Sequence, residues 1–487
     1  MLFSAPIFLF LFLPIVLAGY GFVGRRLRNF FLLGASIFYY AWGEGRYVVL
    51  LIFSIFLNFT FGILAARYRD SSKGRLIIWL ALFMNLGALV WYKYTAFIAS
   101  NINFILSSIE VPPVQIQNHD LPLGLSFFTF QAIAYVLDVY REETAPQQSL
   151  IKFALFMSLF PKLAAGPIIR HGEVAEDLTD RKIDLELFSS GVRRFVIGLG
   201  KKVLIADTIA KTTEKIFAIP GQDLPSDLAW LGIICYSLQI YFDFSGYSDM
   251  AIGLGRMLGF KIQENFNYPY IACSLTDFWR RWHISLSTWF RDYLFVPLSY
   301  ALMTDRIRKK IGEGNYKTNY RSVFSIVMVF TLCGFWHGAG YNFIAWGMLH
   351  GVILGLESLW LGRVIQKWKA PLQHAYLLFI VTMAWVLFRS PGVKSAFSYF
   401  KALAGFTSTN SLYYHISLYL NTELLVVLLA GVVGAAPISK VIRGYFERDS
   451  MRRLMPFAEV AFIIMILLAS FASLAGSTFS PFIYQKF

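Results

Sequence analysis

One histidine, His337, stands out in this sequence because of its surroundings, LCGFWHGAG. It closes an uncharged hydrophobic run, and histidine is the side chain that exchanges a proton near neutral pH without unusual help. An ionisable group deep in an apolar segment is costly and by default indicates a functional site. We expect the neighbouring glycines to bend the backbone and leave room for a substrate: Gly334, Gly338 and Gly340. A neutral imidazole bonded to a nearby carbonyl is an equal alternative at this point.

A second histidine, His283, lies in TDFWRRWHISLSTWFRDYL (276–294). At 100° per residue this segment predicts one amphipathic helix, with His283, Trp279 and Trp282 on its apolar arc. The opposite arc suits headgroups, water or the phosphates of an acyl carrier. It carries Arg280, Arg281 and Arg291. A solvated face is the plainer interpretation of any one arginine, and a core histidine is the plainer interpretation of His283 taken alone.

Other polar residues lie between these segments. Asp243 and Asp249 occupy an apolar region, where buried carboxylates need donors or cations. We predict that they pair with an arginine of the following segment as a structural clamp, rather than act as acid and base. In the connector QENFNYPY, Asn265 and Asn267 are placed to bind a carbonyl or the backbone. His350 is equally consistent with a structural role and a functional one.

The remaining signals are weaker. Four histidines in loops or at segment ends are expected on the solvated surface: His119, His171, His374 and His415. The three cysteines lack disulfide or metal-ligand spacing, so we predict no metal site. The sequence has no Walker loop, GxSxG, HExxH or CxxC motif. What remains is a two-histidine site in a membrane, with polar access from inside.

Composition and hydropathy indicate what kind of protein holds these residues. The chain has 487 residues, is 57% hydrophobic and is 15% charged, against about 25% charged in soluble domains. Its mean hydropathy is +0.56, and long apolar stretches recur throughout. This predicts an all-α polytopic membrane protein with one continuous domain, 1–487. We divide it into N-terminal spans (1–120), a motif-bearing core (121–362) and C-terminal spans (363–487).

The net charge of +15 indicates orientation rather than nucleic-acid binding. Basic residues gather in short connections, whereas 109–122 contains no Lys or Arg, which is the positive-inside pattern. The N-terminal run lacks a basic start and is followed by Arg25 to Arg28, so we expect a first span rather than a cleaved signal. Both termini are expected outside.

About ten to twelve spans are expected, since roughly 20 apolar residues cross a bilayer. The stretch 150–170 is broken by two prolines and a glycine and predicts a re-entrant element buried in protein. An amphipathic interfacial segment, 171–190, and an outer segment, 390–421, are also expected. The predicted apolar helices are 5–23, 30–42, 47–66, 76–108, 123–140, 191–218, 227–258, 322–337, 341–362, 372–389, 422–440 and 456–475.

Several motifs together resemble a known family. LPLGLSFFTFQAIAYVLDVYR, FPKLAAGPIIR, YFDFSGYSDMAIG, ENFNYPY, DFWRRWHISLSTWFRDYLFVPL and GFWHGAGYNFIAWGMLHG occur in this order over 121–351. They are similar to the membrane-bound O-acyltransferase family, in its bacterial branch that O-acetylates alginate and related exopolysaccharides. The resemblance implies packed helices around a funnel or tunnel. It also implies that His337 is catalytic and that His283 is the second important polar position.

The residue patterns and the family resemblance indicate the same site. We predict catalytic roles for His337 and His283, with Asp243, Asp249 and His350 as structural polar residues. Substrate contacts are expected from Trp336, Trp279, Trp282, Arg281, Asn265 and Asn267.

The expected reaction moves an acetyl group from a cytosolic thioester, acetyl-CoA or an acyl carrier, with no tightly bound cofactor. His337 would be the base and His283 would polarise the carbonyl or orient the acyl group, with a transient acyl-histidine left open. From Arg321 in the inner loop the helix rises about 24 Å to His337, toward the outer leaflet. A passage joining the two histidines would let the acyl group cross alone.

The resemblance favours the bacterial inner membrane and a periplasmic partner, an SGNH-type acetyltransferase, within a polysaccharide export complex surrounded by lipid. Three alternatives stay open: D-alanyl transfer toward teichoic acid, export of a polymer or lipid without chemistry, and a scaffold of a synthase complex.

Overall fold

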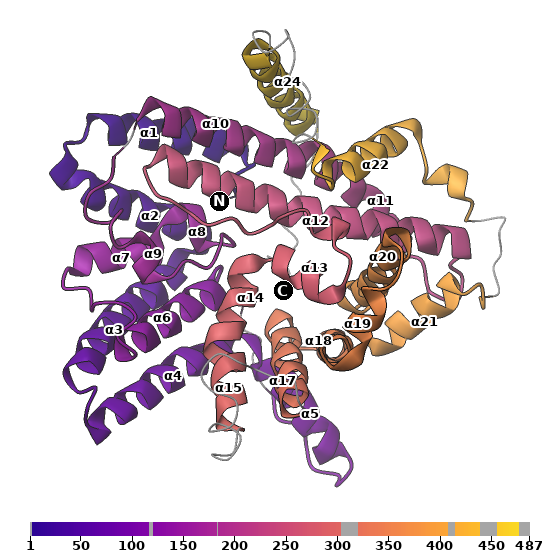
Figure 1. The fold of residues 1–487 in the computed structure, drawn as a ribbon, viewed down its shortest axis with the longest axis horizontal. Coiled ribbons are helices and arrows are strands. Elements are labelled where there is room, and N and C mark those ends of the chain that lie inside the picture. Colours follow the sequence, from indigo (N-terminus) through magenta and orange to yellow (C-terminus); the bar gives the residue numbers. More distant parts are fainter. Residues whose placement is uncertain are drawn as a thin grey trace. The chain divides into compact units, whose positions relative to one another are not determined.

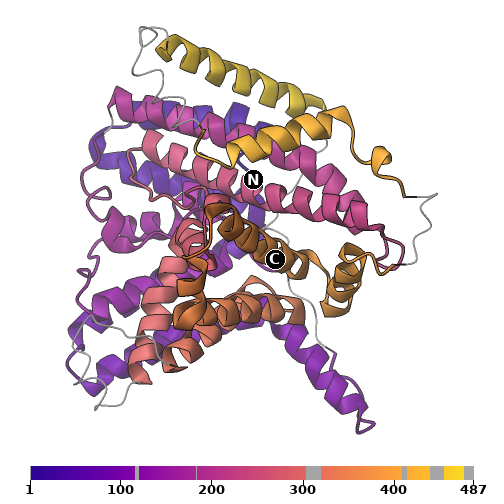
Figure 2. The same cartoon turned by 45° about the vertical axis from the view of Figure 1, so that its right-hand side comes forward.

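The computed structural model of the protein describes residues 2–115, 120–182, 184–302, 320–407, 414–438 and 455–476. Within these ranges all regular structure is helical (Figures 1 and 2). The chain divides into two compact units. Unit 1 comprises Met1–Gly198 and Tyr247–Glu264, and unit 2 comprises Leu199–Gly246 and Asn265–Phe487. The predicted all-α architecture is confirmed.

Unit 1 is built from the N-terminal helices, and its longest helices form where apolar residues predominate in the sequence. In Figure 1, α3, α4 and α6 pack side by side, and α7 packs against α2. Their bounds are η1 Phe8–Phe12, α1 Leu13–Phe22, η2 Arg25–Leu27, α2 Arg28–Glu44, η3 Gly45–Tyr47, α3 Val48–Arg67, α4 Ser72–Lys93, α5 Thr95–Ser107, α6 Leu125–Tyr140, α7 Leu150–Ser158, α8 Phe160–Leu163, α9 His171–Val174 and α10 Leu185–Gly200, whose last two residues belong to unit 2.

Unit 2 carries both predicted catalytic histidines. It begins with η4 Lys201–Ala206 and α11 Asp207–Phe217, followed by α12 Ser226–Met257, whose C-terminal end belongs to unit 1. The later elements are η5 Pro269–Ile271, α13 Leu275–Arg281, α14 Ile284–Phe290, η6 Arg291–Phe295, α15 Val296–Ala301, α17 Tyr320–His337, α18 Tyr341–Leu356, η7 Glu357–Leu361, α19 Gly362–Ile365, α20 Ala370–Arg389, α21 Val393–Leu403, η8 Ile416–Leu418, α22 Thr422–Gly434 and α24 Met455–Gly476.

Among the residues that the structure describes, six helical stretches are long and apolar enough to cross a membrane, and five shorter apolar helices of 10–17 residues accompany them. One of the six, Arg25–Arg67, contains both α2 and α3, which separate where Gly45 adopts a φ of +51°. The multi-pass character predicted from composition is confirmed. The number of crossings and the orientation stay predictions.

The stretch 150–170 is broken as predicted. Helix α7 ends at Ser158, and α8 begins at Phe160, with Pro161 in its first turn, where the missing proline N–H is tolerated. Nearly all side chains from Phe153 to Ile169 are buried. Interior packing is the condition under which irregular backbone is tolerated in a membrane.

The segment 276–294 is not the single helix that its periodicity predicted. Helix α13 ends at Arg281, and His283 adopts a left-handed conformation with φ +44° before α14 begins. A left-handed residue interrupts the helical ladder, so the two arcs counted at 100° per residue do not continue across the break. The burial of Trp279, Trp282 and His283 is nevertheless as predicted.

Candidate functional site

His337 is the last residue of α17, and its side chain is only 4% exposed. Aromatic rings surround the imidazole: the ring centroids of Trp336, Trp346 and Phe388 lie 4.7, 5.1 and 5.2 Å away. The Trp346 and Phe388 rings meet it edge to face. This environment orients the ring by packing, as a catalytic side chain requires.

The glycines before and after His337 do not leave room for a substrate, contrary to our expectation. A Cβ at Gly334 would lie 2.2 Å from the Phe343 carbonyl oxygen of α18, and one at Gly338 would lie 2.2 Å from the Phe343 ring. A Cβ at Gly347 of α18 would lie 2.2 Å from the Phe330 carbonyl of α17. These glycines therefore let α17 and α18 approach backbone to backbone, as small residues do between membrane helices.

His283 is fully buried, and one amide oxygen fixes its orientation. Asn265 Oδ1 lies 3.2 Å from His283 Nδ1 and also accepts from the backbone N–H and the hydroxyl of Ser285, at 3.1 and 2.9 Å. Because a backbone N–H can only donate, it identifies this atom as the amide oxygen. His283 Nδ1 must then carry the proton, which leaves a lone pair on Nε2.

The His283 ring is neutral at pH 7 because burial lowers its pKa to about 3. Its Nε2 has no hydrogen-bond partner among the described residues. The Phe244 ring meets it edge to face at 4.6 Å. The break between α13 and α14 thus presents a buried hydrogen-bond acceptor.

Asn267 and Arg281 attach the connector 263–270 to the end of α13. The Asn267 N–H donates to the Arg281 carbonyl at 3.0 Å, and Arg281 Nη1 donates to the Asn267 carbonyl at 3.3 Å. Arg281 Nε also donates to Asp277 at 2.9 Å. These contacts fasten the connector beside α13, and the predicted substrate contacts of both residues stay predictions.

Packed aromatic rings link the surroundings of the two histidines. Trp346, which contacts His337, stacks on Trp385 at 6.2 Å, and Trp385 lies 5.1 Å from Trp282. Trp282 directly precedes His283. Trp279 lies 5.9 Å from Trp346, so Trp279 of α13 and Trp282, which directly follows α13, both belong to this aromatic wall.

A cavity of about 560 Å³ lies between α14 and α17. Trp279, Phe290 and Cys333 form part of its apolar wall, and the exposed Arg280 and Arg291 are at its edge. Neither histidine lines it, although α14 begins just after His283 and α17 ends at His337. A continuous passage joining the two imidazoles stays a prediction.

Sequence reasoning missed Glu357, which positions α13. Its carboxylate accepts from the backbone N–H groups of Leu275 and Thr276, both at 2.8 Å, and from the Tyr376 hydroxyl at 3.0 Å. Backbone N–H groups of a first helical turn lack partners within the helix, and an acidic group satisfies them. The sequence does contain a signal for Glu357, because it is the one carboxylate in the apolar run 341–365.

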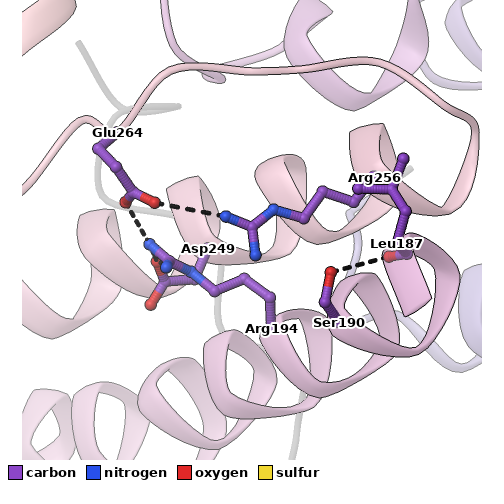
Figure 3. Close-up of polar contacts among 6 residues, drawn as sticks. All are labelled: Leu187, Ser190, Arg194, Asp249, Arg256 and Glu264. Carbon is purple, nitrogen blue, oxygen red and sulfur yellow. Dashed lines mark hydrogen bonds and ion pairs between the residues drawn. The ribbon is translucent and has the colours of Figure 1, made fainter.

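The two aspartates form clamps, but their partners precede them in the chain. Asp249 accepts from Arg194 Nε of α10 at 2.8 Å, and Arg194 also reaches Glu264, which lies 3.7 Å from Arg256 (Figure 3). Within unit 2, Asp243 pairs with Lys202 at 2.7 Å. The predicted arginine of the following segment is therefore wrong.

The other histidines differ in their surroundings. His350 is buried, and its Nδ1 lies 2.9 Å from the Trp346 carbonyl, which must accept, so this ring too keeps a lone pair on Nε2. His171 is buried between Tyr135 and Phe156, so its predicted surface position is wrong. His374 is half-buried, His415 is exposed as predicted, and His119 lies outside the described residues.

Comparison with known proteins identifies the family that this chain matches. The sequence pattern of the membrane-bound O-acyltransferase family matches residues 35–400. The chain is 36% identical to a probable alginate O-acetylase of Pseudomonas putida over the whole of both chains. It is 35% identical to a peptidoglycan O-acetyltransferase of Helicobacter pylori, covering 83% of this chain and 80% of that one. It is 31% identical to a teichoic acid D-alanyltransferase of Bacillus subtilis, covering 56% of this chain and 68% of that one.

Proposed function

The chain belongs to the membrane-bound O-acyltransferase family and is a membrane acyltransferase, and from that premise we propose that it supplies acetyl groups for O-acetylation of an exported polysaccharide. The full-length similarity to a probable alginate O-acetylase and the similarity to a peptidoglycan O-acetyltransferase support an acetyl group and a polysaccharide. The observation that carries the chemistry is the pair of buried imidazoles at the ends of α14 and α17, joined by one aromatic wall.

The donor is a thioester on a pantetheine arm, either acetyl-CoA or an acyl carrier protein. The cavity between α14 and α17 suits it, because its wall is apolar and two guanidinium groups, Arg280 and Arg291, stand at its edge. Guanidinium groups bind phosphates with charge-assisted hydrogen bonds. Arg280 makes no hydrogen bond or ion pair with any described side chain or backbone group.

His337 acts as the general base. The acceptor hydroxyl oxygen attacks the thioester carbonyl carbon while His337 takes the hydroxyl proton. Collapse of the tetrahedral intermediate breaks the C–S bond, and the proton passes from His337 to the leaving thiolate. A positioned base of this kind contributes about 10²–10⁴-fold to the rate.

His283 is better suited to orient the donor than to polarise the carbonyl. Its neutral Nε2 has a lone pair and no proton to donate, so it accepts a hydrogen bond, for which the pantetheine amides offer N–H groups. The indole N–H of Trp346 instead polarises the thioester carbonyl. That N–H is buried, lacks a partner among the described residues, and belongs to the ring that packs on His337. A donor aimed at the developing oxyanion is a large catalytic contribution.

The acceptor lies on the outer face, and the immediate recipient is a hydroxyl of an SGNH-type periplasmic acetyltransferase that passes the acetyl group to the polymer. This relay places the chain in the bacterial inner membrane. Candidate spans and the family pattern support the multi-pass character on which it rests.

The test measures acetyl transfer by the purified protein and acetate on exported polymer, with protein abundance in parallel. His337→Gln should lower kcat about 10²–10⁴-fold. Trp346→Phe, which keeps the ring, should lower kcat about 10²-fold. His283→Phe should raise the donor KM more than it lowers kcat. His415→Gln, at an exposed site, is the matched control. Normal acetylation at normal abundance in His337→Gln would end the proposal.

The same preparation separates the alternatives. Acetyl-CoA and a D-alanyl carrier protein are offered separately, because the similarity to a D-alanyltransferase covers only 56% of this chain. Turnover with the D-alanyl carrier alone would favour that activity. Absence of any acyl turnover would favour an exporter, and dispensable histidines would favour a scaffold.

A further inference from the structure

We propose that the groove between α1 and α2 is a binding site for one anionic phospholipid, whose phosphate is held by Arg25 and Arg26. The groove has a volume of about 740 Å³ and lies far from the histidines in the sequence. Every residue that lines it is apolar, among them Leu11, Ile15 and Phe38. This site does not depend on the proposed acyl transfer.

The length and the openness of the groove suit an acyl chain. Its lining residues run from Ile7 to Val23 along the first helix and from Leu27 to Trp42 along the second. At 1.5 Å per residue each side extends about 24 Å, most of the hydrocarbon thickness of a bilayer. Gly34 contributes no side chain, and a Cβ built there would meet nothing within 4 Å, so the groove is open at its middle.

Positive charge gathers where the two helices join. Arg25 and Arg26 lie in the turn η2 between them, are exposed, and make no ion pair or hydrogen bond with any described residue. The guanidinium of Arg28 lies 5.3 Å from the centre of the Tyr20 ring, and Arg181 Nε donates to the Tyr20 hydroxyl at 3.1 Å. Four arginines therefore converge on this end of the hairpin.

No acidic residue precedes Glu44, the last residue of α2, so positive charge alone lies at the end of the hairpin where α1 and α2 join. An apolar groove that ends at unpaired guanidinium groups matches a molecule with an acyl chain and a negatively charged headgroup. Basic pockets between membrane helices on the cytoplasmic side bind such headgroups. A helix of another protein would fill the groove but would leave Arg25 and Arg26 without an anion, so the charge favours the lipid.

The test uses the purified full chain in detergent, with phosphatidylglycerol and phosphatidylcholine of the same acyl chains as probes. Native mass spectrometry measures the lipid retained at each added concentration. The unmodified chain should retain one phosphatidylglycerol with at least tenfold higher affinity than phosphatidylcholine.

Two changes address the two halves of the site. Arg25→Gln with Arg26→Gln should abolish the preference for phosphatidylglycerol. Gly34→Leu places a side chain in the groove at a position where a Cβ meets nothing within 4 Å, and it should lower retention of both lipids at least tenfold. Gly21→Leu is the matched control, because Gly21 is equally open and exposed but does not line the groove. A charge-retaining variant, Arg25→Lys with Arg26→Lys, preserves the orientation signal and should keep part of the preference.

Three outcomes would overturn the proposal. Equal retention of the two lipids by the unmodified chain would show an acyl groove without headgroup recognition. Unchanged retention in Gly34→Leu, with the same elution profile as the unmodified chain, would place the lipid elsewhere. Copurification of a stoichiometric helical protein that only Gly34→Leu releases would identify a protein partner as the occupant.

Discussion

At the scale of single residues, the tautomer of His283 decides what this side chain can do. Asn265 Oδ1 accepts a hydrogen bond from the proton-bearing Nδ1 of His283, so only the lone pair of Nε2 faces the interior. The sequence placed His283 on a buried face but could not assign its tautomer, because Asn265 comes from a separate connector. His171 shows the opposite error. Its position at a segment end resembled a surface site, yet rings from α6 and α7 cover it.

His171 predicts a pH dependence of stability. It lies outside the candidate spans, and burial, together with the charge of Lys162, lowers its pKa to about 4. Its unfolded pKa is about 6.5, so between these values only the unfolded state binds the proton. The contribution of His171 to stability is therefore complete above pH 6.5 and is lost as the pH falls toward 4.

The expected loss from His171 is about 2 kcal/mol at pH 5. Thermal unfolding in detergent between pH 7.5 and 5 measures it. His171→Gln should flatten the pH dependence, whereas His415→Gln, at an exposed site, should leave it unchanged. Identical slopes in all three proteins would contradict the assignment.

At the scale of elements, helix existence was predictable and helix continuity was not. The apolar runs that form α3, α4, α18 and α20 were found because hydrophobic residues predominate in each of them. The break at His283 was missed because periodicity cannot detect one left-handed residue inside an amphipathic pattern. The break is held by Asn265, whose amide oxygen contacts His283 and accepts from Ser285. Asn265 belongs to a separate connector and reaches these residues only after folding. The glycines around His337 were recognised as unusual, but their role in packing depends on α18.

The contact between α17 and α18 predicts a sharp difference between two glycine substitutions. In Gly334→Ala the new Cβ would meet a backbone oxygen that cannot move aside, and we expect a loss of about 1–3 kcal/mol. In Gly87→Ala of α4 the Cβ meets nothing, and the gain in helix propensity is up to about 1 kcal/mol. Melting temperatures and yields of the two purified variants provide the measurement. Equal melting temperatures would contradict backbone-to-backbone packing.

At the scale of the whole molecule, composition was sufficient for the class of protein, and motif order was sufficient for the family. Neither could foresee that α12 contributes to both compact units, because unit membership depends on contacts between distant stretches of chain. The single membrane domain that we expected stays a prediction. So does the orientation, which rests on the distribution of Lys and Arg.

Orientation can be tested with a pair of serine-to-cysteine changes. Ser72 begins α4 beside a basic loop, Ser108 follows α5 beside the loop without Lys or Arg, and both are exposed. Cys235 and Cys333 are buried, so only the half-buried Cys273 needs replacement by alanine.

A membrane-impermeant maleimide added to spheroplasts should label Ser108→Cys directly and Ser72→Cys only after permeabilisation. Equal labelling of the two before permeabilisation would contradict the predicted orientation.

The carboxylate that closes the first turn of α13 also has a consequence for synthesis. Glu357 follows Leu275 by 82 positions in the chain. A ribosome adding about 5–20 residues per second needs roughly 4–16 s to deliver it. During that interval Leu275 and Thr276 lack the carboxylate that accepts from their N–H groups in the folded protein, so we expect water or the insertion machinery to satisfy these groups until the later hairpin arrives.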